Sequence, residues 1–548
     1  MNKEESSYQR MIKEIHDFLG NRELIFFGKM KKARDLEFVF NIHFRQVYDT
    51  ASEKVGLSNN TFVIFCKQDN YNKFIDENCL NWNSDYCYDE DLFEFLNLFI
   101  SKDFISGYIA VWGTGKVCDD FLNNFKKIDL KDKIKYFVCT QKEEEEKNGI
   151  KIVTPQEIAA CDCKIVMAVN HKNFCEIEKE CQRVGIKRER YIYFQQLMDN
   201  PGDFFKQTYN DEKYYDIECL NLDKTMRIFR DGSISVCCLS PENKYGNIYE
   251  DSLENAYNSI RAQIGRVSLL NHTYTFCNHS TCPFLAGLKN EQKKSEYEES
   301  YTYKYEKYPD CITPLMGYTC NLYCTSCRNS VLIEPDEELV NWVEVIKEKI
   351  AKLPVRLILN PQGEVLANKF CLDFIHDSNC LSRGHISLYT NGTLLDKKML
   401  DWILDNYVLD DLSISIDAST EGTYNKIRRG GNWNQLMNNI QYISKMKKAG
   451  RIPYWVVQFV IQRDNVAELQ SFVEKAEQWG VDEIEFNGID NWGTYTDEEF
   501  QKVNVLKDGR LKEEYKKYFI DELLEDPKVY WGTFTNLLGT KHRYIRTL

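Results

Sequence analysis

The stretch ITPLMGYTCNLYCTSCR (residues 312–328) carries three cysteines, Cys320, Cys324 and Cys327, directly after an apolar run. The Cys-x3-Cys-x2-Cys spacing supplies three thiolates, and thiolates are the ligands that iron–sulfur clusters use. Three protein ligands leave one iron of a 4Fe–4S cluster open to another molecule. A structural zinc site would need two Cys-x2-Cys pairs or added histidines, and neither lies near this stretch. The spacing therefore favours a cluster with an open iron.

From residue 311 onward, short apolar runs alternate with amphipathic segments of helical length, which predicts βα units around a parallel sheet. Six such units fit an incomplete (β/α)6 barrel better than an eight-fold closure. Reactive residues of such barrels lie at the C-terminal ends of strands, and the three cysteines directly follow the first strand. The expected strands are Ile312–Tyr318, Val355–Asn360, His385–Thr390, Leu412–Asp417, Trp455–Ile461 and Glu483–Asn487, and the expected helices include Glu337–Leu353, Lys369–Ser378, Trp433–Lys448 and Val466–Trp479.

Turns after the second, third and fourth expected strands carry small and polar residues. They read Gln362-Gly363-Glu364-Val365, Tyr389-Thr390-Asn391-Gly392 and Ser415-Ile416-Asp417, with Arg428 and Arg429 a short way beyond. Taken singly, Asn-Gly is a tight-turn signal and an Asp after a strand often caps a helix. Their order and spacing after a cysteine triplet make coincidence a poor explanation.

Together, the cysteines and turns resemble the radical S-adenosylmethionine enzymes over roughly residues 308–490. The resemblance implies that the open iron binds S-adenosylmethionine, which one electron cleaves to a 5′-deoxyadenosyl radical. It also implies that Gly363 approaches this cofactor and that Glu364 accepts hydrogen bonds from its ammonium group, while the Asn391 turn adjoins it. Ser415 would contact the ribose, and Arg428 or Arg429 a carboxylate. Gln362 and Val365 depart from the family's usual glycine and proline.

A second group of cysteines precedes the barrel, within residues 206–295. A hairpin with an Asp231-Gly232 turn is followed by a helical stretch expected from Leu253 to Arg266. This segment resembles the SPASM or twitch iron–sulfur domain, which normally follows the barrel. The resemblance implies one auxiliary 4Fe–4S cluster, and a zinc site, with these thiols or with His279 joining them, remains open. The candidate ligands are Cys219, Cys237 or Cys238, Cys277 and Cys282.

The sequence contains an internal repeat, with one copy in residues 1–100 and a second copy in residues 101–205. Strand-like runs at residues 24–28, 44–50, 61–65 and 86–88 parallel runs at 109–113, 134–140, 163–167 and 191–193. Strand, glycine turn, helix and strand in both copies predict two small Rossmann-like α/β units. Because Cys118 occupies the third glycine position of a phosphate-binding turn, a degenerate scaffold is favoured over dinucleotide binding. The second copy resembles small Rossmann units that accompany enzymes of surface-sugar and polysaccharide pathways.

Composition restricts the class of protein. The chain has 548 residues, 43% hydrophobic and 28% charged, with a net charge of −14, which disfavours nucleic-acid binding. The first residues lack an apolar signal region and no apolar run is long enough to span a bilayer, so a cytoplasmic protein is expected. Twenty cysteines in such a chain argue for metal sites and buried thiols rather than disulfides. Residues 491–548 read as a helical tail.

These patterns predict an oxygen-sensitive radical enzyme that acts on a peptide or protein. Modification of a sugar or glycolipid is the alternative, suggested by the N-terminal units. A non-catalytic iron–sulfur scaffold or redox sensor is a third reading, but it does not explain Glu364 and the ordered turns. The enzyme would need a reducing partner such as a flavodoxin- or ferredoxin-like protein.

Overall fold

The computed structural model describes residues 7–49, 55, 57–67, 69–140, 144–169, 171–211, 219, 224–237, 244–249, 252–279, 282, 285, 306–315, 317–333, 336–350, 353–360, 362–376 and 384–540. Cys238 lies outside these residues. The chain forms two compact units. The first contains the described residues up to 211 together with Ser259–Asn271, and the second contains the other described residues. No described helix is long and apolar enough to cross a membrane.

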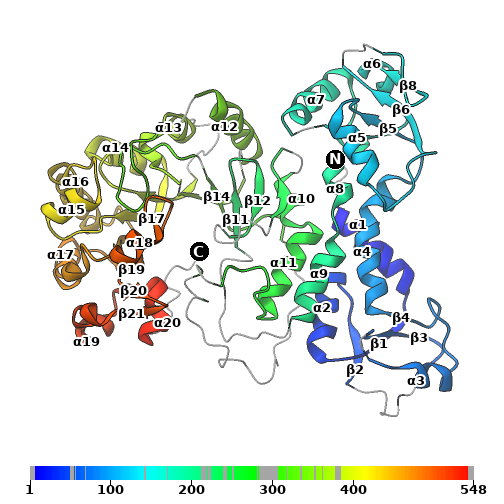
Figure 1. Cartoon of the computed structure of the whole chain (residues 1–548), viewed down its shortest axis with the longest axis horizontal. Helices are drawn as coiled ribbons and strands as arrows, with labels where there is room; N and C mark the ends of the chain where they lie inside the picture. The colour runs from blue at the N-terminus through cyan, green and yellow to red at the C-terminus, as the bar shows by residue number, and fades with distance from the viewer. Residues whose placement is uncertain are drawn as a thin grey trace. The chain divides into compact units, whose positions relative to one another are not determined.

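The first unit begins with a four-stranded parallel sheet in the order β2-β1-β3-β4 (Figure 1). Its middle strands are apolar and almost entirely buried, as expected for a parallel sheet covered on both faces. Its strands are β1 (Glu23–Phe27), β2 (Phe44–Tyr48), β3 (Thr61–Phe65) and β4 (Tyr86–Tyr88), and its helices are α1 (Ser7–Leu19), α2 (Met30–Phe40), α3 (Asn72–Glu77) and α4 (Asp89–Phe104).

A second sheet in the same unit repeats this topology. The strands β6-β5-β9-β10 are parallel and follow the order of their counterparts β2-β1-β3-β4. The repeated runs predicted from sequence thus occupy matching places in two sheets. The elements are β5 (Ile109–Trp112), β6 (Ile134–Val138), β7 (Glu146–Lys147), β8 (Ile150–Val153), β9 (Lys164–Met167), β10 (Tyr191–Tyr193), α5 (Lys116–Asn124), α6 (Pro155–Ala159), α7 (His171–Val184) and α8 (Phe194–Met198).

Helix α9 (Pro201–Asn210) packs closely along α4. The backbone N–H of Gly202 donates to the side-chain oxygen of Asn97 at 2.8 Å. Helix α11 (Ile260–Leu270) belongs to the same unit and packs against α9 and α2, although it comes much later in the chain.

The second unit contains a ten-stranded sheet whose centre is six parallel strands in chain order. Each overlaps one of the six predicted strands. They are β14 (Cys311–Pro314), β15 (Arg356–Leu359), β16 (His385–Thr390), β17 (Val408–Ser415), β18 (Tyr454–Ile461) and β19 (Glu483–Gly488), and the helices between them are α12 (Asp336–Ile350), α13 (Lys369–His376), α14 (Lys397–Asn406), α15 (Glu421–Ile427), α16 (Trp433–Lys448) and α17 (Leu469–Trp479). However, β14 ends at Pro314 rather than Tyr318, and β17 begins at Val408 rather than Leu412.

The two faces of this sheet differ in chemistry. Phe459 of β18 packs on Phe472 of α17, with ring centroids 4.8 Å apart, so the odd-numbered positions of β18 face the helices. Gln458 therefore lies on the opposite face, and it is paired in register with Ser415 and Glu485. The face away from the helices is thus polar in its central strands.

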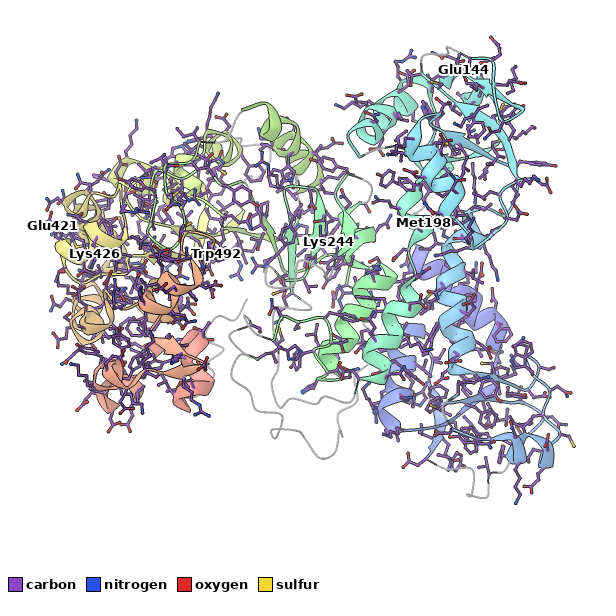
Figure 2. The ribbon with its side chains drawn as sticks, viewed as in Figure 1. Glu144, Met198, Lys244, Glu421, Lys426 and Trp492 are labelled. Carbon is purple, nitrogen blue, oxygen red and sulfur yellow. The ribbon has the colours of Figure 1, made fainter. Side chains whose placement is uncertain are left out.

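Further strands flank this centre at both edges. Strand β11 (Thr225–Ile228) pairs in parallel with β14, and it forms an antiparallel meander with β12 (Ser233–Ser235) and β13 (Lys244–Asn247). The predicted hairpin thus continues the barrel sheet. Lys244 of β13, labelled in Figure 2, forms an ion pair of 2.9 Å with Asp231 in the hairpin turn.

Two sequence predictions need correction. The helix expected over Leu253–Arg266 is two helices, α10 (Leu253–Tyr257) and α11, because the side chain of Ser259 caps the first turn of α11. The tail beyond residue 490 is not purely helical, since its strand β22 (Val529–Tyr530) pairs in parallel with β19. Its other elements are α18 (Asp497–Val503), β20 (Leu506–Lys507), β21 (Arg510–Leu511), α19 (Asp521–Leu524), α20 (Thr535–Leu538) and two 3-10 helices, η4 (Glu513–Tyr518) and η5 (Gly532–Phe534).

Candidate functional site

The three clustered cysteines lie in the loop between β14 and α12, at the C-terminal edge of the sheet. The backbone N–H of Cys320 donates to the carbonyl of Leu332 at 2.9 Å, which closes the loop. The carbonyl of Cys324 accepts from the N–H of Cys327 at 3.0 Å. This turn leaves the Cys320 and Cys324 side chains half-buried and that of Cys327 exposed.

The three thiols lie within electrostatic reach of one another. Burial raises the pKa of Cys320 to about 11, and the nearby Cys324 contributes to the rise. Burial likewise raises the pKa of Cys324, with Cys327 adding to it. A cluster would bind these sulfurs as thiolates and displace their protons, so the donor set fits an iron–sulfur centre. Among the described residues, no three His, Cys, Asp or Glu side chains are grouped as ligands for a single metal ion.

Arg428, the first residue after α15, faces this loop. Its Nη1 lies 3.8 Å from the sulfur of Cys324, and its Nε lies 2.7 Å from Oδ2 of Asp417. Although burial opposes the charge, the Asp417 carboxylate raises the pKa of Arg428 above its usual value. Arg428 is therefore a fixed positive charge beside a candidate cluster ligand, already paired with a protein carboxylate.

Gly363 and Glu364 form the turn after β15 and press against the cysteine loop. A Cβ at Gly363 would lie 2.2 Å from the carbonyl oxygen of Thr319, so only glycine fits there. The N–H of Glu364 donates to that same oxygen at 2.8 Å.

The Glu364 side chain is buried and joins two turns. Its Oε1 accepts from the hydroxyl of Thr390 at 2.6 Å and from the N–H of Leu366 at 3.2 Å, while Oε2 accepts from the N–H of Asn391 at 2.6 Å. Burial raises the pKa of Glu364, and these hydrogen bonds oppose the rise. The carboxylate therefore holds the turns after β15 and β16 together.

The Asn391 side chain in turn contacts the cysteine loop. Its Nδ2 donates to Oδ1 of Asn321 at 2.9 Å, and Asn321 donates to the hydroxyl of Thr393 at 2.9 Å. Sequence reasoning missed Asn321, although its position directly after Cys320 was a usable signal.

Ser415 lies on the polar face of the sheet. Its hydroxyl donates to the side-chain oxygen of Gln458 at 2.9 Å, and Gln458 donates to Glu485 at 3.0 Å. Asn487 donates to the other oxygen of Glu485 at 2.9 Å. This hydrogen-bonded row across three strands was not predicted, because it depends on strand register.

Arg429, the alternative to Arg428, has a structural role. Its Nε donates to the carbonyl of Tyr323, and its Nη2 donates to the carbonyl of Arg328, both at 3.0 Å. Its guanidinium also lies over the Tyr323 ring, 5.0 Å from the centroid. Arg429 thus links the segment after α15 to the cysteine loop by hydrogen bonds.

Cys219 and Cys282 of the second unit lie within electrostatic reach of Cys277. Burial raises the pKa of Cys277, and the nearby Cys219 and Cys282 add to the rise. Cys237 follows β12, before the third strand of the meander, and its backbone N–H donates to the hydroxyl of Ser235 at 3.3 Å. His279 directs a ring nitrogen to the carbonyl of Tyr274 at 3.1 Å.

Comparisons with protein families agree with this layout. Residues 315–476 match the radical SAM superfamily, and residues 219–283 match SPASM, an iron–sulfur cluster-binding domain. Residues 106–192 match the C2185-like N-terminal family, which covers most of the second Rossmann-like unit. The SPASM match precedes the radical SAM match in the chain, as predicted.

Curated relatives match about a third of the chain at low identity. A GTP 3′,8-cyclase of Limosilactobacillus fermentum is 27% identical over 200 residues, which are 34% of this chain and 59% of that protein. The PqqA peptide cyclase of Gluconobacter oxydans is 26% identical over 188 residues, 34% and 51% of the two chains. Mycofactocin maturase MftC of Mycobacterium tuberculosis is 25% identical over 175 residues, 32% and 43%. The chain spans about half the length of these relatives.

Among solved structures, Streptococcus suis SuiB bound to its precursor peptide SuiA is 14% identical with a TM-score of 0.30, covering 52% of this chain and 57% of that one. The enzyme anSMEcpe with bound AdoMet is 19% identical with a TM-score of 0.25, covering 33% and 50%. The domain matches, together with the cysteine loop and its supporting turns, show that the chain carries a radical SAM domain with a SPASM domain before it.

Proposed function

We propose that the chain modifies a peptide or protein by abstracting a hydrogen atom from it. The observation that carries the proposal is the joint presence of a radical SAM and a SPASM domain, in a chain whose relatives include a peptide cyclase and a mycofactocin maturase. The relatives also include GTP 3′,8-cyclases, so a nucleotide substrate is the competitor that an experiment must separate.

In this proposal Cys320, Cys324 and Cys327 would hold the catalytic 4Fe–4S cluster, which would supply the electron for reductive cleavage of S-adenosylmethionine. Arg428 sets the charge around Cys324.

The turns after the strands would hold S-adenosylmethionine. Gly363 keeps the turn after β15 close to the cysteine loop. The hydrogen bond between Glu364 and Asn391 holds that turn to the turn after β16. Ser415, on the polar face, would contact the ribose, with its orientation set by Gln458.

The auxiliary 4Fe–4S cluster would be held by Cys219, Cys277, Cys282 and one of Cys237 and Cys238. The electrostatic effect of Cys219 and Cys282 on the Cys277 thiol supports this assignment. A full set of four thiolates suits electron transfer from a substrate radical. The electron that starts the reaction would come from a flavodoxin- or ferredoxin-like protein.

The substrate class can be tested through the fate of the abstracted hydrogen. Cells of the organism that encodes the protein are grown in deuterated medium, and their extract is separated into peptide, nucleotide and carbohydrate fractions. Each fraction is incubated with the reduced enzyme and S-adenosylmethionine. Deuterium in 5′-deoxyadenosine is expected from the peptide fraction, and protease treatment should remove it. Deuterium transfer from the nucleotide or carbohydrate fraction alone would overturn the proposal.

A further inference from the structure

Helix α11 belongs to the SPASM match in sequence but to the first unit in space. The match covers residues 219–283, so α11 lies between Cys237 and Cys277 along the chain. Nearly all its side chains are buried, and it packs against α2 and α9 of the first unit. The chain therefore enters the first unit at Ser259 and leaves it after Asn271, between two sets of candidate cluster ligands.

A buried ionic network holds the end of this helix. Lys31 and Asp35, both on α2, form an ion pair of 3.0 Å in which the side chains are 6% and 0% exposed. Both oxygens of Asp35 accept from Nδ2 of Asn271 at 3.2 Å. Lys31 also donates to the carbonyls of Thr208 and Tyr209 at 2.7 and 3.1 Å. The network thus ties α2, α9 and the C-cap of α11 together.

The loop that follows Asn271 is tightly wound. His272 and Tyr274 are buried and adopt left-handed backbone conformations, with φ of 58° and 52°. Non-glycine residues keep such conformations only where their surroundings enforce them. The N–H of Cys277 then donates to the carbonyl of Tyr274 at 3.0 Å. The loop that carries Cys277 therefore begins where α11 ends.

We propose that Asp35 and Asn271 are positioning residues for the auxiliary cluster. Asp35, 236 residues before Asn271 in the chain, fixes the C-cap of α11 and so the start of the loop that carries Cys277 and Cys282. The first Rossmann-like unit then serves to hold a segment of the cluster-binding domain. The inference rests on the proposed ligand role of Cys277 and Cys282.

The test uses the full chain with Cys320, Cys324 and Cys327 replaced by Ala, so that only the auxiliary cluster remains. In this background, Asn271→Leu cuts the link while the Lys31–Asp35 pair stays. A second variant, Lys31→Met with Asp35→Leu, removes the ion pair and, with Asp35, the carboxylate that accepts from Asn271. Apolar replacement of a buried ion pair is often neutral for stability. The matched control is Asn97→Leu, which removes the hydrogen bond from Gly202 of α9 to α4.

For each variant we would measure the iron content, the electron paramagnetic resonance spectrum of the reduced cluster and the midpoint potential of the cluster. The melting temperature of each variant is recorded as well. Both test variants are expected to lose about half or more of the ~4 irons or to shift the spectrum and potential, while Asn97→Leu keeps the parent's values. Test variants indistinguishable from Asn97→Leu would overturn the inference. An absent cluster in the background chain itself would instead overturn the ligand assignment, and the inference with it.

Discussion

At the scale of single residues, the charge on Arg428 bears most directly on the proposed catalytic cluster. It lies 3.8 Å from the sulfur of Cys324 and is held there by Asp417. A positive charge beside a cluster stabilises the reduced form, which carries one more negative charge, and so raises the reduction potential. Arg428 should therefore make the electron transfer to the cluster easier.

Replacing Arg428 with Gln should lower the potential of the catalytic cluster. About 1.4 kcal/mol of lost attraction corresponds to about 60 mV for a one-electron couple, and a shift of that order is expected. The variant also leaves Asp417 buried without its partner, at a cost of about 3–5 kcal/mol in unfolding free energy. Redox titration followed by electron paramagnetic resonance measures the shift, and calorimetry measures the stability.

The double variant Arg428→Gln with Asp417→Asn is the control. It removes both charges, so stability should recover in part and the potential should fall less than in the single variant. Equal potentials in the native protein and the single variant would show that Arg428 does not act on the cluster.

Glu364 is expected to act through the turns that it joins. In Glu364→Gln, an amide NH2 would face N–H and O–H donors, leaving at least one buried donor without an acceptor, at about 1–3 kcal/mol. The melting temperature should fall, and binding of S-adenosylmethionine should weaken as the Asn391 turn loosens. Glu421→Gln on the exposed start of α15, labelled in Figure 2, should change neither quantity. Full stability in Glu364→Gln would contradict this role.

At the scale of elements, the close contact between the turn after β15 and the cysteine loop makes a sharp prediction. Gly363→Ala places a Cβ 2.2 Å from the Thr319 carbonyl oxygen, so the backbone must move apart beside Cys320. We expect loss of iron from the catalytic cluster and loss of 5′-deoxyadenosine formation. Gly422→Ala in α15 meets nothing within 4 Å and should be neutral or stabilising by up to about 1 kcal/mol. Normal iron content in Gly363→Ala would contradict the account.

Local sequence patterns predicted the elements well where a strand or helix carries its own signal. The runs at His385–Thr390 and Trp433–Lys448 form a strand and a helix with those bounds. The pairing of β11 with β14 was not predictable, since it joins residues over 80 positions apart and leaves no local pattern. The partners of Glu364 likewise depend on how two turns meet in space.

At the scale of the whole molecule, the chain order and the spatial order differ. The SPASM segment precedes the catalytic domain, its strands extend the catalytic sheet, and its helix α11 folds with the Rossmann-like units. Periodicity predicted a helix over Leu253–Arg266, which overlaps α11, but periodicity carries no information about which unit buries α11. An interruption of one compact unit by another becomes visible only from the contacts.

The measurement that tests the central claim most directly compares the anaerobically reconstituted native chain with its Cys320→Ala, Cys324→Ala, Cys327→Ala variant. The native chain should hold about eight irons and form 5′-deoxyadenosine after reduction, whereas the variant should keep about four irons and form none. Continued 5′-deoxyadenosine formation by the variant, or an unchanged iron content, would contradict the account.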